Sequence, residues 1–158
     1  MKKITTRDDE VYSSDVFEIL FDYEITRTKR NPAPLALMQI EITSTTSNEE
    51  SLKSAPIVFI RALNSHLRSV DIPSKAGNDF RILLPTTDEP GARTVCERLL
   101  SIFKNKFDTP RGPVAFTLQI GATICPAGTD ISMSDVTEKA KEALKQSKLK
   151  GPNTFVIQ

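Results

Sequence analysis

The chain has 158 residues and a formal net charge of +1, with 39% hydrophobic and 26% charged residues. That length and composition suit one soluble domain with one core, and no apolar run approaches the roughly 20 residues of a membrane span. The balanced charge excludes a general attraction to nucleic acid or membrane, and the start lacks a secretory signal, so we expect a cytoplasmic protein.

Cysteine and histidine are scarce in this sequence. The chain has two cysteines, Cys96 and Cys125, and one histidine, His66. A structural zinc site takes more Cys and His ligands than these, so a metal centre of that kind is excluded. We expect both thiols to be reduced and packed inside the domain.

The first half of the chain predicts two helices and a strand. Residues 1–14 begin with polar side chains and are expected to form a flexible N-terminus. Apolar residues then recur at helical spacing over 12–30, and the alternating residues 35–43 predict a strand. A polar loop follows. A second helix is predicted over 55–68, with Pro56 in its first turn.

The second half predicts a hairpin and then two further pairs of a helix and a strand. The hairpin turns at Gly77 and Asn78, which both tolerate positive φ. The two hairpin strands are expected at residues 70–75 and 79–85. The later helices are expected at 87–106 and 132–150, and the later strands at 114–125 and 153–157. This order predicts an α+β fold with a central mixed, mostly antiparallel sheet of about five strands flanked by helices.

Several stretches resemble motifs of the GGDEF (diguanylate cyclase) family. That family reads RxxD, then RYGGDEF and an apolar strand that ends in Leu-Pro. Here Arg68 and Asp71 match RxxD, and AGNDF at 76–80 stands in place of GGDEF. QIGAT at 119–123 resembles the family's SIGVA strand, and KAKEALKQSKLKGPN at 139–153 resembles its ADxALYxAKxxGRN segment.

The resemblance implies that residues 15–158 form a degenerate GGDEF domain, with the nucleotidyl-cyclase-like fold but without the cyclase chemistry. A working cyclase joins two GTP molecules by means of divalent cations held by two carboxylates. Glu41 falls at the first carboxylate position, Thr43 replaces a further acid there, and Asp79 or Asn78 falls at the second. The loop that reads guanine is replaced by STTSNEESLKS. The active-site remnants are Glu41, Gly77, Asn78, Asp79 and Lys148, and we expect no catalysis, no metal and no cofactor.

Many cyclases of this family also bind their product, cyclic di-GMP, at an inhibitory site built from RxxD and a further arginine. The resemblance places Arg68, Asp71 and Arg98 at these positions. A guanidinium can donate two parallel hydrogen bonds to guanine O6 and N7, and a carboxylate can accept from guanine N1 and N2. We therefore expect a cyclic di-GMP receptor, although Arg and Asp at this spacing more commonly form an ordinary surface pair.

Two other functions stay open at this point. The domain can be a protein-interaction or dimerisation module that uses no nucleotide, either as a homodimer or with a protein partner from a signalling pathway. It can also be a residual diguanylate cyclase that acts on GTP. Neither nucleic acid nor membrane is expected as a partner.

Overall fold

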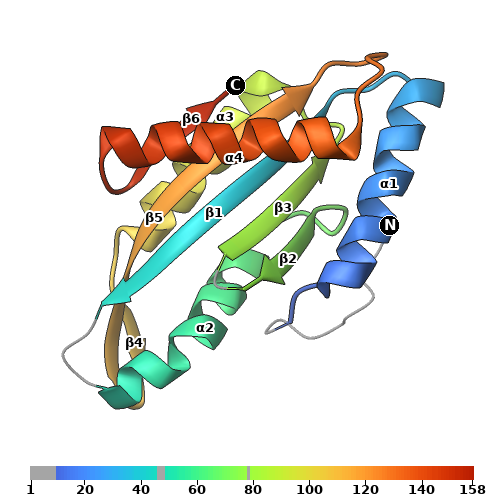
Figure 1. Cartoon of the computed structure of the whole chain (residues 1–158). Coiled ribbons are helices and arrows are strands. Elements are labelled where there is room, and N and C mark those ends of the chain that lie inside the picture. Colours follow the sequence, from blue (N-terminus) through green and yellow to red (C-terminus); the bar gives the residue numbers. More distant parts are fainter. Residues whose placement is uncertain (1–9, 46–48, 78) are drawn as a thin grey trace.

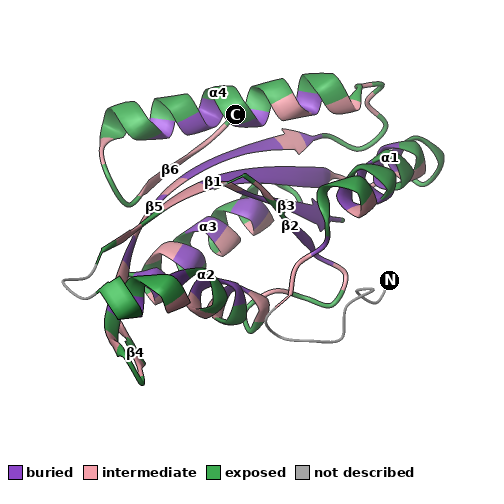
Figure 2. Cartoon of the chain, turned by 60° about the horizontal axis from the view of Figure 1, so that its bottom comes forward, coloured by how far each residue is buried: buried purple, intermediate pink, exposed green. Residues whose placement is uncertain are grey.

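The computed structural model describes residues 10–45, 49–77 and 79–158. One sheet forms the middle layer, and helices cover both of its faces (Figures 1 and 2). The helices described are α1 (Ser14–Arg30), α2 (Glu49–Asn64), α3 (Glu89–Phe103) and α4 (Met133–Lys150). α1 and α4 pack on one face of the sheet, and α2 and α3 pack on the other. None of these helices is long and apolar enough to cross a membrane.

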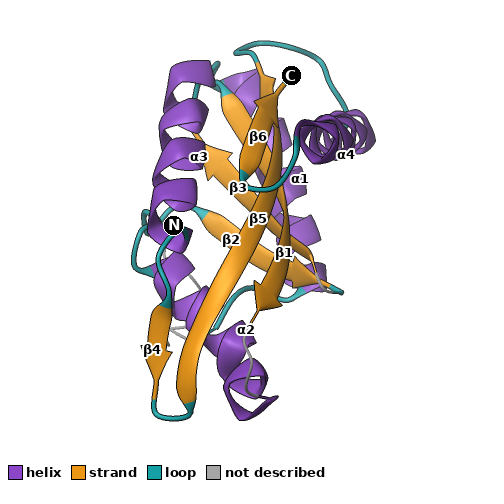
Figure 3. Ribbon diagram, turned by 90° about the vertical axis from the view of Figure 1, so that its left-hand side faces the viewer, coloured by secondary structure: helices purple, strands orange, loops and turns teal. Residues whose placement is uncertain are grey.

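The sheet has the mixed, mostly antiparallel pairing that the sequence predicts. Its strands are β1 (Leu35–Thr45), β2 (Ile72–Ala76), β3 (Asp79–Pro85), β4 (Phe107–Thr109), β5 (Gly112–Cys125) and β6 (Thr154–Ile157). The order β2-β3-β1-β5-β4 is antiparallel throughout, and β6 pairs in parallel with β5. Figure 3 shows β6 and β4 beside opposite ends of β5. The α+β prediction is therefore confirmed.

The central strand β1 supplies side chains to two separate hydrophobic clusters. Leu35 and Leu37 pack against α1 and α4, whereas Ala36, Met38 and Ile40 pack against α2 and α3. This division follows from the alternation of side chains along a strand. Because both faces of β1 are covered, its first six residues are all buried, including the polar Gln39.

Gly121 on β5 allows α4 to approach the sheet closely. A Cβ at this position would lie 2.6 Å from a backbone oxygen of α4, so a larger residue fits only if the helix moves. Near the end of α4, Ser147 Oγ donates to Gln119 Oε1 at 2.7 Å, and Gln119 Nε2 donates to Gly151 O at 2.7 Å. These contacts fix the last turn of α4, which carries Lys148, over β5.

α2 begins earlier than the sequence predicts. It starts at Glu49 rather than at residue 55, so Pro56 lies inside the helix. An interior proline costs about 3 kcal/mol. Acidic residues in the first turn suit the positive end of the helix dipole, and Ser51 Oγ donates to Arg111 O at 2.6 Å. Contacts of this kind stabilise a first turn that directly follows a polar loop rich in Ser and Thr.

β4 was not predicted, and α3 is shorter than predicted. β4 pairs with the start of β5 through a tight turn that ends at Gly112, whose φ is 123°. α3 begins after its N-cap Asp88 and ends at Phe103 rather than at residue 106. A strand of three residues is too short to leave an alternating pattern in the sequence.

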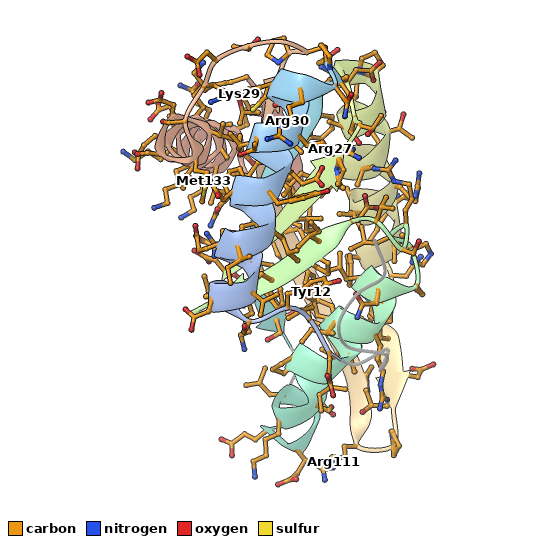
Figure 4. All side chains as sticks on the ribbon, turned by 90° about the vertical axis from the view of Figure 1, so that its right-hand side faces the viewer. Tyr12, Arg27, Lys29, Arg30, Arg111 and Met133 are labelled. Carbon is orange, nitrogen blue, oxygen red and sulfur yellow. The ribbon has the colours of Figure 1, made fainter. Side chains whose placement is uncertain are left out.

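The described part of the predicted flexible N-terminus lies against β2. The backbone N–H of Tyr12 donates to Pro73 O at 2.9 Å, and Asn64 Nδ2 donates to Glu10 O at 2.8 Å. Tyr12 is 4% exposed, and Figure 4 shows it between α1 and α2. Residues 1–9 lie outside the described residues.

Candidate functional site

The loop after α2 joins Arg68 and Asp71 in one ion pair. α2 ends at Asn64, so both residues lie beyond the helix, which was predicted to reach Arg68. Asp71 Oδ2 accepts from the backbone N–H of Arg68 at 2.7 Å, and Oδ1 accepts from Nε and Nη2 of Arg68 at 3.1 and 2.8 Å. The side chain of Asp71 is 3% exposed and that of Arg68 is 52% exposed. A buried carboxylate therefore lies beneath a half-exposed guanidinium.

The same guanidinium connects this loop to the end of β3. Nη2 of Arg68 also donates to Pro85 O at 2.9 Å and to Thr87 Oγ1 at 3.0 Å. Nη1 has no acceptor among the described residues. Charge-assisted hydrogen bonds are stronger than neutral ones, so they fix the orientation of the guanidinium. Arg68 therefore has Nη1 available for a ligand.

Arg68 and Arg98 line one open hollow at the start of α3, with a volume of about 520 Å³. Arg98 lies on α3, and its Nη1 donates to His66 O at 3.1 Å, in the loop that carries Arg68. Asp71 does not line this hollow, because it is buried beneath Arg68. We call this open hollow the α3 hollow. Its lining residues are Pro34, Arg68, Thr86, Thr87, Asp88, Gly91, Thr94, Val95 and Arg98.

A second, smaller hollow of about 240 Å³ lies between α1 and β2 and shares Arg68 with the first. Arg27 Nη2 donates to Thr86 Oγ1 at 3.1 Å, and Arg27 Nε pairs with Glu24 Oε1 at 3.3 Å. Burial raises the pKa of Glu24, and the charge of Arg27 partly offsets that rise. We call this smaller hollow the α1 hollow. Its lining residues are Leu20, Tyr23, Glu24, Arg27, Arg68, Val70, Ile72, Pro85 and Thr86.

Three arginines therefore surround the turn that follows β3. The sequence singled out Arg68 and Arg98 but not Arg27, which belongs to a basic last turn of α1 that Figure 4 labels. That basic turn was the available signal, and it has an ordinary explanation in the helix dipole. Guanidinium groups next to apolar walls can bind a ligand that is both anionic and aromatic.

The predicted active-site remnants lie together at the other end of β3. Glu41 and Asp79 are directly opposite each other on β1 and β3. Lys148 Nζ pairs with Glu41 Oε2 at 2.5 Å. Burial raises the pKa of Asp79, the charge of Glu41 raises it further, and Lys148 lowers it. Gly77 forms the adjoining turn at a φ of +65°, and Asn78 lies outside the described residues.

Around Glu41 the structure places one carboxylate, Asp79, and one ammonium, Lys148. Thr43, on the same face of β1, offers a hydroxyl in place of a carboxylate. The ammonium of Lys148 already neutralises Glu41. Across residues 10–45, 49–77 and 79–158 there is no group of three or more His, Cys, Asp or Glu that can hold a metal ion. A divalent cation at this place would have to displace Lys148.

Solved structures with a similar fold are GGDEF domains and a diguanylate cyclase. Diguanylate cyclase SiaD from Pseudomonas aeruginosa, in complex with its activator SiaC, matches with a TM-score of 0.82 and 20% identity, over 99% of this chain and 62% of that chain. The FimX GGDEF domain from Pseudomonas aeruginosa matches with a TM-score of 0.78 and 16% identity, over 98% of this chain and 100% of that chain. The DgcB GGDEF domain from Caulobacter crescentus, in complex with c-di-GMP, matches with a TM-score of 0.75 and 16% identity, over 99% of this chain and 96% of that chain. At these identities the likeness shows the fold.

The family comparison gives the membership that the structural likeness alone does not. None of the curated proteins matches the chain. Residues 57–154 match the family described as diguanylate cyclase, GGDEF domain. The matched segment runs from α2 to the start of β6 and includes the loop of Arg68, the hairpin and α4. The chain therefore belongs to the GGDEF family.

Proposed function

We propose that this domain is a receptor for cyclic di-GMP and carries out no cyclase reaction. The observation that supports the proposal most is that Arg68 and Arg98, from a loop and a helix, line the same open hollow. The volume of about 520 Å³ lies within the range of small-molecule sites. The bound cyclic dinucleotide of the DgcB complex belongs to that protein and serves here only as a precedent for the fold.

The hydrogen-bonding capacity of the two arginines suits a guanine nucleotide. Arg98 uses Nη1 for His66 O, which leaves Nε and Nη2 for a ligand. Arg68 offers Nη1 from a fixed orientation. Such donors can bond to guanine O6 and N7 or to phosphate oxygens, and a good bidentate pair with a base is worth about 1–3 kcal/mol. The cationic rim would also attract both phosphates of cyclic di-GMP.

Asp71 takes a different part in this proposal from the one that the sequence suggested. Its carboxylate is 3% exposed, and both oxygens accept hydrogen bonds from Arg68. Guanine cannot reach such a group without breaking the pair. Asp71 is therefore proposed as a positioning residue that fixes Arg68, and not as a direct contact to the ligand.

The absence of cyclase activity is supported by the region around Glu41. Lys148 neutralises this carboxylate, and Thr43 does not replace the missing acid. Catalysis of nucleotidyl transfer needs cations that bind the triphosphate and stabilise developing charge. Incubation with GTP and magnesium, followed by chromatography of the nucleotides, tests this part of the proposal. Formation of cyclic di-GMP would contradict it.

One observation favours a second candidate function, an interaction module that needs no nucleotide. Ile19 and Tyr23 lie one turn apart on α1 and are 69% and 61% exposed. An exposed apolar pair on a helix can contribute to a protein interface. Sedimentation of the protein with and without cyclic di-GMP separates the two functions, because an interaction module would assemble equally in both conditions.

Calorimetric titration with cyclic di-GMP tests the receptor directly. We expect Arg98→Ala to weaken binding by about tenfold or more, the equivalent of one lost bidentate contact. Arg93→Ala is the matched control, because Arg93 lies on the same helix but pairs with Glu89 and does not line the α3 hollow. The control should bind as the unmodified protein does. No heat of binding at high micromolar ligand would overturn the receptor function.

A further inference from the structure

The α3 hollow holds a carboxylate that neither the sequence motif nor the proposed function uses. Asp88 lines this hollow together with Arg68 and Arg98, and it is exposed. It follows Thr87 in the chain, and Thr87 Oγ1 accepts from Nη2 of Arg68 at 3.0 Å. The carboxylate of Asp88 therefore comes from the residue next to a direct contact of the Arg68 guanidinium.

Arginine contacts already favour guanine over adenine, because guanine has the acceptor O6 where adenine has an amino donor. Phosphates are the same in every cyclic dinucleotide and add no discrimination between the bases. The Watson–Crick edge of guanine offers a second difference, its N1–H and N2 amino donors. A carboxylate accepts from both donors, whereas adenine offers it no such pair. To read this second difference, the site needs an accessible carboxylate beside an arginine.

Asp71 does not meet this requirement, but Asp88 does. The oxygens of Asp71 accept from three donors of Arg68, and its side chain is 3% exposed. Asp88 Oδ1 accepts from the backbone N–H of Gly91 at 2.9 Å, as the N-cap of α3. Its Oδ2 receives no hydrogen bond, and Asp88 forms no ion pair, among the described residues.

We infer that Asp88 is the carboxylate that reads guanine in the α3 hollow, accepting from N1–H and N2, while Arg68 Nη1 donates to O6 of the same base. This inference rests on the proposed receptor function and gives it a specificity residue. The N-cap bond to Oδ1 orients the carboxylate and leaves Oδ2 for one guanine donor, while the second lone pair of Oδ1 can accept from the other. A carboxylate also repels phosphate, so Asp88 weakens the binding of any cyclic dinucleotide whose base it does not contact.

The test separates the role in capping from the role in recognition. Asp88→Ser keeps a side-chain oxygen that can cap α3 but removes the second acceptor and the charge. Titrations of the full chain with cyclic di-GMP and cyclic di-AMP give the ratio of the two affinities. We expect Asp88→Ser to weaken cyclic di-GMP by about tenfold and to leave cyclic di-AMP equal or tighter. Asp88→Asn should weaken cyclic di-GMP at least as much, because its amide donors face the donors of guanine.

Two controls keep the outcomes distinct. Asp135→Ser removes the same charge from the first turn of α4 and should change neither affinity. Thermal melting shows whether each variant is folded. If Asp88→Ser leaves the ratio of affinities unchanged while Arg98→Ala abolishes binding, the role of Asp88 is overturned and the receptor function stands. If the unmodified protein binds neither dinucleotide, both proposals fall.

Discussion

The two ends of β3 carry ionic groups that are arranged in opposite ways. At its start, the ammonium of Lys148 lies on the carboxylate of Glu41, and both side chains are partly exposed. At its end, the carboxylate of Asp71 is buried, and the guanidinium of Arg68 above it is half exposed. In the first case an acid of a kind that can bind a cation is neutralised by the protein itself. In the second case a cation is oriented by a buried acid and keeps an unoccupied donor.

This difference shows that an ion pair can either close a site or prepare one. A pair at the surface gains little free energy and competes directly with any external ligand. A buried acceptor beneath an exposed donor does not compete, because the ligand approaches the donor from the solvent side. The proposed loss of cyclase chemistry at one end of β3 is thus compatible with the proposed ligand binding at the other end.

The largest expected effect comes from breaking the pair at the end of β3. Asp71→Asn replaces three charge-assisted bonds to Arg68 and leaves amide donors facing its N–H groups. We expect the free energy of unfolding to fall by about 2 kcal/mol, as for other hydrogen bonds to charged groups. Urea denaturation measures this change. Asp108→Asn, at an exposed position on β4, is the matched control and should change stability by less than about 0.5 kcal/mol.

The affinity of Asp71→Asn for cyclic di-GMP sharpens the comparison between the two ends of β3. If Asp71 only positions Arg68, cyclic di-GMP should bind more weakly to folded Asp71→Asn. An unchanged free energy of unfolding together with unchanged affinity would show that the buried carboxylate does not orient the guanidinium.

A smaller effect is expected at the start of β3. Lys148 lowers the pKa of Asp79, whereas burial and Glu41 raise it. Lys148→Met should therefore raise the pKa of Asp79, which a pH titration followed by NMR at its carboxyl carbon measures. Because the Lys148–Glu41 pair is partly exposed, stability should change by less than about 1 kcal/mol. Lys145→Met, on the exposed side of α4, is the control. A pKa of Asp79 that stays constant or falls would contradict this account of the cluster.

The fold was largely predictable because its central elements have strong local patterns. The predicted returning strand of the hairpin agrees with β3 at both ends, and the predicted end of the last helix agrees with the end of α4. The start of α2 was missed because its polar first turns, with Ser51 and Ser54, continue the polar character of the loop before them. β4 was missed because three residues show no periodicity.

The candidate site was predictable in its composition but not in its geometry. The RxxD motif and Arg98 pointed to the residues, and the structure places both arginines in one hollow. Whether a carboxylate is buried or exposed depends on how the loop closes over it, and spacing along the chain does not record that. Asp71 therefore lies beneath its partner, while Asp88, which belongs to none of the family motifs, lies in the α3 hollow.

The smallest expected effect concerns Glu24, which borders the α1 hollow beside Arg27. Burial raises its pKa above the ordinary value of 4.5, so the fold favours the protonated form. The stabilising contribution is then fully present below the pKa of the unfolded chain and is lost as the pH rises through the higher folded pKa. Glu24→Gln cannot ionise, so its unfolding free energy should depend less on pH across that interval. Urea denaturation at several pH values over roughly 4 to 7, the range in which carboxyl groups of raised pKa titrate, measures both slopes. Identical slopes for the two proteins would mean that folding leaves the pKa of Glu24 unchanged, because the charge of Arg27 fully offsets the effect of burial.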